Sequence, residues 1–306
     1  MNVAANRARV FAAVLLCGIS GLLQAQVNVT TEHNDVSRTG QNTQETILTP
    51  SNVNSTQFGK LFSVPVDGAV YAQPLYLSAV TIAGVPHNIV YIATEHDSVY
   101  AIDADSGSVY AHVSLIPAGG TTVSSSTDLG CGDLVSEVGI TGTPVIDPMG
   151  GTLYVVAKSK VNGSIVQYLH ALDVATLAEK FNGPVRIQAT VNGTGYDAGA
   201  GSVAFNAKQE NQRAALLLEN GHVVIAWTSH CDTDPWHGWV ISYNSGTLAQ
   251  EAAFNTSPNG NETFSIDTIN ADGSGDTPVV TTINKLMESP TWQPIPPKPI
   301  VPGYVR

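Results

Sequence analysis

The stretch Tyr100-Ala-Ile-Asp-Ala-Asp-Ser-Gly107, an apolar run that ends in a small polar turn, has two further copies in this chain. The copies are His170-Ala-Leu-Asp-Val-Ala-Thr-Leu177 and Ile241-Ser-Tyr-Asn-Ser-Gly-Thr-Leu248. The polar residues that follow the three runs, Asp103, Asp173 and Asn244, are separated by 70 and 71 residues. A nearly constant spacing of this kind indicates a repeat architecture, in which one structural unit is used several times.

Each repeat contains four segments rich in Val, Ile, Tyr and Thr, separated by Gly, Asn, Asp and Ser, a composition typical of β-strands and turns. The expected strands are Val70–Val80, Asn88–Thr94, Ser98–Asp103 and Ser108–Ile116, then Gly142–Asp147, Thr152–Lys158, Val166–Asp173 and Lys180–Ala189, then Arg213–Leu218, His222–Thr228, Gly238–Tyr243 and Ala249–Phe254. Four antiparallel strands per repeat predict an all-β fold, a β-propeller with about three blades over residues 70–256.

Three blades do not close a ring, because propellers typically have about four to eight. Thr277–Val280 is similar to the first strand of a further blade, but the pattern is not continued after it. Residues 257–306 are therefore predicted to be an irregular tail, rich in proline from Ser289 onward. We expect a truncated propeller, which we favour, a frameshifted one, or one that self-associates to complete the ring.

Composition and charge narrow the class of protein. Only 12% of the 306 residues are charged and 43% are hydrophobic, which suits a β-rich globular chain with a sizeable core. The net charge is −12, and removal of residues 1–25 would take away two arginines and no acidic residue, leaving −14. An acidic surface repels phosphate groups, so we expect no nucleic-acid partner.

The N-terminus has the features of an export signal. Arg7 and Arg9 precede the apolar run Val10–Leu23, which is too short for a membrane span, and a cleavage site is expected near Ala25. Residues 1–25 are thus predicted to be a signal peptide, and residues 26–69 a lead-in segment with a strand before the blades. The expected location is secreted or periplasmic, without a membrane span.

The repeated element resembles a known one. Ala101–Gly107 and Ala171–Thr176 are similar to the Ala-x-Asp-x-x-Thr-Gly-x-x-x-Trp element of pyrroloquinoline-quinone (PQQ)-type propeller repeats. In those families the element joins each blade to its neighbour, and the tryptophan packs between blades. Here the tryptophan positions hold Ala111, Phe181 and Ala252, so the motif is degenerate.

Three further stretches carry the same resemblance. His33–Gly40, Thr94–Tyr100 and Gly139–Asp147 are similar to segments of exported bacterial PQQ-like propeller proteins. The resemblance covers residues 30–260 and implies the fold more firmly than any chemistry, because a fold does not confer its relatives' activity.

Cys131 and Cys231 are the two cysteines that would remain after signal removal. In an oxidising compartment they could form a disulfide, or they could be two unrelated thiols. The loops that carry them are expected on the same face of the propeller, so the disulfide is physically reasonable.

The candidate ligand-binding residues lie in the loops between the second and third strands of the first and third repeats: His96, Asp97, His230, Asp232, Trp236 and His237. Imidazole and carboxylate groups suit a divalent metal, so one hypothesis is a metal site formed by His96, His230, His237, Asp232 and Asp234. The alternative is that these are turn residues, which Asp and His often are, and their spacing matches no metal motif.

The third repeat also holds three tryptophans, Trp227, Trp236 and Trp239, which could stack on a sugar or a quinone but more often pack between blades. Near the N-terminus, Arg38 could bind an anion. We favour a structural role for it, in which it donates to backbone carbonyls or a carboxylate where the segment meets the ring.

The sequence favours a non-catalytic binding or interaction module with a protein or carbohydrate ligand. The alternative is a quinoprotein oxidoreductase of alcohols or sugars that would use PQQ and calcium, or an inactive fragment of one. The enzyme hypothesis needs docking tryptophans, a complete ring and placed Glu, Asn or Asp ligands. No catalytic residue can be assigned from the sequence.

Overall fold

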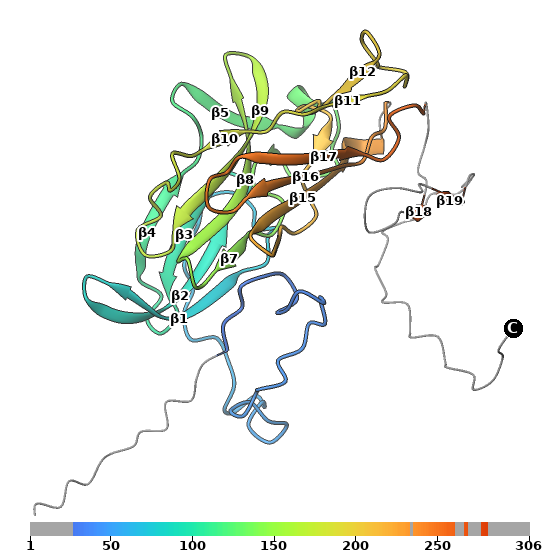
Figure 1. Ribbon diagram of the computed structural model, residues 1–306. Coiled ribbons are helices and arrows are strands. Elements are labelled where there is room, and N and C mark those ends of the chain that lie inside the picture. The colour runs from blue at the N-terminus through green and yellow to red at the C-terminus, as the bar shows by residue number, and fades with distance from the viewer. Residues whose placement is uncertain (1–26, 233–234, 261–265, 269–276, 281–306) are drawn as a thin grey trace, which may run out of the picture.

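The computed structural model describes residues 27–232, 235–260, 266–268 and 277–280, and the chain within them is almost entirely β (Figure 1). The predicted signal peptide and the proline-rich end, residues 281–306, lie outside the described residues. Within the described residues, no helix is long and apolar enough to cross a membrane.

The first blade is a four-stranded antiparallel sheet in the order of the chain. Its strands are β1 (Leu75–Ile82), β2 (Val85–Ala93), β3 (Ser98–Asp103) and β4 (Val109–Ser114). All six residues of β3 are buried, because Val99 and Ala101 face the core shared with the second blade, while Ser98 and Tyr100 contact Asp67 of the lead-in segment.

The second blade has the same order but is larger. Its strands are β7 (Val145–Asp147), β8 (Thr152–Val161), β9 (Ser164–Asp173) and β10 (Val185–Arg186). Strand β8 extends past the predicted end and also pairs with β5 (Gly120–Ser124), which in turn pairs with β6 (Glu137–Val138). The π-helical turn η1 (Ser125–Leu129) lies between β5 and β6.

The third blade consists of β14 (Leu217–Glu219), β15 (His222–Ser229), β16 (Trp239–Asn244) and β17 (Gln250–Asn255). Strand β13 (Glu210–Asn211) also pairs with β15, and the 3-10 turn η2 (His230–Asp232) follows β15. Two hairpins stand outside the blades: β11 (Thr190–Asn192) with β12 (Ser202–Ala204), and β18 (Ile266–Thr268) with β19 (Thr277–Val280). The described residues thus form three propeller-type blades, as predicted, without a closed ring.

The repeated element forms the turn after the third strand of each blade. The Asp103 carboxylate accepts the backbone N–H of Ser106 at 2.7 Å, and Asp173 accepts that of Thr176 at 3.0 Å. The glycine position of the motif has a left-handed backbone in each copy, with φ of 57° at Leu177 and 58° at Leu248. Both leucines adopt a backbone conformation that favours glycine, and both side chains are buried in the apolar cores between blades.

Two apolar cores hold the three blades together. One lies between the first and second blades, and the other lies between the second and third. A tyrosine hydroxyl crosses each boundary: Tyr91 donates to the carbonyl of Val174, and Tyr154 donates to that of Ser245, both at 2.7 Å. The ring of each tyrosine adds buried apolar area, and its hydroxyl satisfies a backbone carbonyl in a turn.

The segment of residues 28–40 runs across the first strands of all three blades. Val29 pairs with Tyr76 of β1, and the carbonyl of Thr30 accepts the N–H of Ile146 of β7 at 2.8 Å. Arg38 then donates to the carbonyl of Leu216, next to β14, at 3.0 Å. We call residues 28–40 the crossing segment.

Arg38 has the structural role that the sequence favoured. Its guanidinium also donates to the carbonyl of Glu32 at 2.9 Å, and burial lowers its pKa from the ordinary value. Replacing Arg38 with alanine should lower the free energy of unfolding by about 2–3 kcal/mol, because two carbonyls lose a charged donor. Urea unfolding followed by tryptophan fluorescence would measure this, with Arg213→Ala, at an exposed position, as the control. Equal midpoints for the Arg38→Ala variant and the parent protein would contradict it.

Candidate functional site

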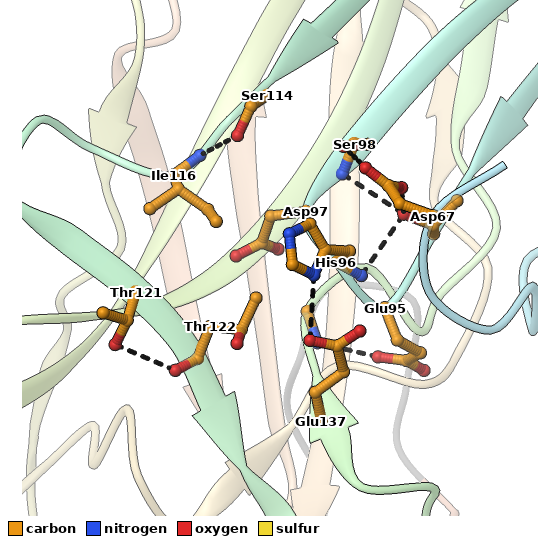
Figure 2. A network of polar contacts seen from close by, with 12 residues as sticks. Asp67, Glu95, His96, Asp97, Ser98, Ser114, Ile116, Thr121, Thr122 and Glu137 are labelled. Carbon is orange, nitrogen blue, oxygen red and sulfur yellow. Dashed lines mark hydrogen bonds and ion pairs between the residues drawn. The ribbon is translucent and has the colours of Figure 1, made fainter.

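Three loops meet at one end of the blades, and we call this end the loop face. They are the β2–β3 loop (residues 94–97), the loop between η1 and β6 (residues 130–136), and the loop between β15 and β16 (residues 230–238). Figure 2 shows the part of the loop face around Glu95, His96 and Asp97. All six candidate ligand-binding residues belong to these loops.

Glu95 is fully buried, which the sequence analysis did not predict. Its carboxylate accepts the N–H of Gly139 at 2.7 Å and the hydroxyl of Thr141 at 3.1 Å. Burial raises the pKa of Glu95 above its ordinary value. The side chain therefore joins the first blade to the segment that leads into the second.

Asp97 is buried as well and points into the second blade. Its carboxylate accepts the hydroxyl of Ser159 at 2.7 Å and the N–H of Lys158 at 3.3 Å. Burial raises the pKa of Asp97 well above its ordinary value. Both oxygens are engaged by β8, so this carboxylate faces inward rather than toward a ligand on the loop face.

His96 lies between these two acids but faces the other way. Its Nδ1 lies 2.9 Å from a carboxylate oxygen of Glu137, and both side chains are partly exposed. Figure 2 shows the ring directed toward Glu137, to which a dashed line joins it. Of the two candidate residues in this loop, His96 is the one that solvent reaches.

Lys158 is the buried lysine of the site. The sequence analysis predicted it only as the last residue of a strand. Its ammonium donates to the carbonyls of Lys208 at 3.0 Å and Glu210 at 3.1 Å, and lies 2.8 Å from His230 Nε2. Burial lowers the pKa of Lys158 to about 7. A lysine after the apolar run Leu153–Ala157 was the signal that could have marked it.

Burial also shifts the pKa values of two neighbours of Lys158. Burial raises the pKa of Glu210 to about 8 and lowers that of His230 to about 4. At neutral pH, Glu210 is therefore mainly a neutral acid and His230 a neutral imidazole. Such shifts make a functional role possible, but buried structural networks show them too.

The structure joins Cys131 and Cys231 in a disulfide, the arrangement that the sequence left open. Asp133 lies beside it, with a carboxylate oxygen 3.1 Å from His230 Nδ1. The bond connects the loop before β6 to the turn after β15, so it spans the second and third blades.

His237 and the tryptophans mainly support the third blade. His237 is buried, with Nε2 2.9 Å from Asp197 and Nδ1 3.2 Å from Ser257. Trp227 and Trp239 are buried in the core between the second and third blades, where each makes an edge contact with Phe205. Trp236 is only partly buried.

The described histidines of the metal hypothesis, His96, His230 and His237, are not brought together. Within the described residues, three metal-ligating side chains come within 4.8 Å of one another at one place only, and they are Cys131, Asp133 and His230. His96 and His237 are not part of this group. Asp234 and the side chain of Asp232 lie outside the described residues.

A cavity of about 460 Å³ adjoins the loop face beside β10 and β12. Its lining combines charged, amide and apolar side chains: Arg186, Gln188, Asp197, Phe205, Asn206 and Lys208. Two contacts connect it to the loops, namely the Asp197–His237 pair and the bond from Lys158 to the Lys208 carbonyl. The sequence did not predict this cavity.

No family model and no curated protein matches the chain. Solved structures similar to it include a quinohemoprotein alcohol dehydrogenase from Comamonas testosteroni, 18% identical, covering 61% of this chain and 21% of that one, with a TM-score of 0.37. A quinohemoprotein alcohol dehydrogenase from Pseudomonas putida is 16% identical over 63% of this chain and 21% of that one, with a TM-score of 0.38. BamB from Moraxella catarrhalis is 10% identical, covering 61% and 65%, with a TM-score of 0.21.

The chain spans about a fifth of the length of the two dehydrogenases that it matches. They are quinoproteins, the class whose repeats the sequence resembles. At these scores the likeness carries nothing about chemistry, and the blade architecture rests on the chain's own sheets.

Proposed function

We propose that this protein is a secreted or periplasmic binding module, with the blades as scaffold and the loop face with its cavity as the contact surface. The cavity beside β10 and β12 carries the proposal. Its volume of about 460 Å³ lies in the range of small-molecule sites, which run from about 300 to 1,000 Å³.

The lining of the cavity favours an acidic carbohydrate. Arg186 and Lys208 place two cations in one cavity of a chain whose net charge is −12. Guanidinium and ammonium groups bind carboxylates through charge-assisted hydrogen bonds. The amides of Gln188 and Asn206 can bond sugar hydroxyls, and the ring of Phe205 offers an apolar surface.

A non-catalytic role is supported by where the titratable groups of the loop face point. Glu95 and Asp97 accept bonds from the second blade, and Lys158 donates to backbone carbonyls. A general base must reach a substrate within hydrogen-bond distance. These three groups are buried and engaged internally, so they act as a frame for the loops.

The cavity gives a direct prediction. The double variant Arg186→Ala/Lys208→Ala should bind an oligosaccharide of uronic acids at least about tenfold more weakly than the parent, because two charged contacts are removed. Isothermal titration calorimetry would measure the affinity. Arg213→Ala removes an exposed arginine outside the cavity lining and should leave it unchanged. If the double variant binds as the parent does, or if the parent prefers neutral sugars, the proposal is wrong.

The alternative function, a quinoprotein oxidoreductase, can be tested against the residues present. A quinone needs an open aromatic surface, but Trp227 and Trp239 are buried between blades, and Trp227 donates to Gln167 at 2.8 Å. Calcium needs several converging oxygen ligands. Among the described residues, the one group of three His, Cys, Asp or Glu side chains supplies sulfur, nitrogen and only one carboxylate, a set that does not suit calcium. Quinone-dependent dye reduction by the protein with added PQQ and Ca²⁺ would overturn this conclusion.

A further inference from the structure

The group Cys131, Asp133 and His230 has a geometry that the binding function does not use. Asp133 lies at its centre, with one oxygen 3.2 Å from Cys131 Sγ and the other 3.1 Å from His230 Nδ1. The ligand atoms of the three side chains all lie within 4.8 Å of one another. Asp133 is exposed and His230 is buried, so the group opens to solvent at one end and is fixed at the other.

A fourth donor becomes available when the disulfide is opened. Cys231 is bonded to Cys131 and directly follows His230 in η2, so its sulfur remains close after reduction. The set then has two thiolates, one imidazole and one carboxylate, and this mixture suits zinc rather than calcium or magnesium. Tetrahedral zinc, with ligand bonds of about 2.0–2.3 Å, holds its ligand atoms about 3.3–3.8 Å apart. The distances around Asp133 are close to this range.

A contact on the other side of the ring fixes its orientation. Lys158 lies 2.8 Å from His230 Nε2, so the imidazole is held with Nδ1 toward Asp133 and the cysteines.

We propose that Cys131, Asp133, His230 and Cys231 form a zinc site that exists only while the Cys131–Cys231 disulfide is reduced. A dithiol reductant gives two electrons and two protons to the disulfide, which becomes two thiols, and the reductant becomes a disulfide. Zn²⁺ then binds both sulfurs, and the two thiol protons go to solvent. A disulfide oxidant then takes two electrons from the two thiolates and two protons from solvent, and becomes two thiols, while the Cys131–Cys231 S–S bond forms again and Zn²⁺ is released. This site does not depend on the proposed binding of sugars.

The test uses Co²⁺ as a spectroscopic substitute for zinc on the full chain, with a phosphine as reductant because dithiols bind metals. The reduced protein should bind one equivalent of Co²⁺ and show the thiolate-to-cobalt absorption band, and Zn²⁺ should displace the cobalt. The oxidised protein should show no band. Reoxidation should release the zinc to a chromogenic chelator, with a stoichiometry of one.

Two variants separate a built site from binding by loose thiols. Asp133→Asn and His230→Gln should each weaken Co²⁺ binding at least about tenfold, whereas His222→Gln, at an exposed histidine on β15, should not. Zn²⁺ should also protect Cys131 and Cys231 from alkylation in the reduced parent, as peptide mass spectrometry would show, and circular dichroism would establish that the reduced protein is folded. Equal affinity in all three variants, or no thiolate band in the reduced parent, would overturn the proposal.

Discussion

Replacing both Cys131 and Cys231 with serine is expected to lower the free energy of unfolding by about 4.7 kcal/mol in the chain-entropy account. The disulfide closes a loop with a sequence separation of 100 residues, and a loop of that length strongly restricts the unfolded chain. Thermal unfolding in the presence of a chelator, which keeps the cysteines free of metal, would show the loss as a melting temperature lower by about 10 °C.

The reduced parent protein is the control for this double variant. With a phosphine present, the parent should melt at the temperature of Cys131→Ser/Cys231→Ser, and the variant should be insensitive to the reductant. If the oxidised parent and the double variant have the same midpoint, the bond contributes nothing to stability, and the loop face is held by its other contacts alone.

Replacing Glu210 with glutamine should make the protein more stable, and the gain should grow as the pH rises from 5 to 8. Burial raises the folded-state pKa of Glu210 from 4.5 to about 8. The folded chain therefore holds this proton more tightly than the unfolded chain does. The stability that Glu210 contributes is complete below pH 4.5 and is lost as the pH rises through about 8, at up to about 1.4 kcal/mol per pH unit.

The Glu210→Gln variant lacks this titration, so its advantage over the parent should reach about 2–4 kcal/mol at pH 8. Urea unfolding at several pH values would measure the two slopes. Glu219→Gln, at an exposed position on β14, is the matched control and should follow the parent at every pH. Parallel slopes for the parent and Glu210→Gln would mean that the buried carboxyl keeps an ordinary pKa.

Much of the fold could be predicted from the sequence, because the signals for it are local. The recurring Asp103, Asp173 and Asn244 each form a turn with residues two and three positions later, and such turns are specified within a few residues. Strand composition likewise identified the four strands of each blade. The leucines at the motif's glycine position were harder to interpret. Leu177 and Leu248 do not suit the backbone of their turns, but their side chains are buried in the cores between blades.

The site was less predictable, because its contacts join different repeats. The sequence grouped His96 and Asp97 as neighbours in one loop, yet a φ of 54° at Asp97 helps direct its carboxylate into β8 while His96 remains partly exposed. Lys158 is buried only because the carbonyls of Lys208 and Glu210 reach it from an insertion some 50 residues away. A pattern within a few residues of Lys158 cannot predict carbonyl partners that are so far away in the sequence.

The crossing segment imposes an order on how the molecule can be completed. Arg38 emerges early from the ribosome, but the carbonyl of Leu216 that it binds is made 178 residues later. At ordinary rates of synthesis the delay is on the order of ten seconds. The first blade can form its own sheet during that interval, whereas Arg38 has to wait. Residues 28–40 are thus made before the blades that they cross, and the contact of Arg38 with Leu216 is among the last to form.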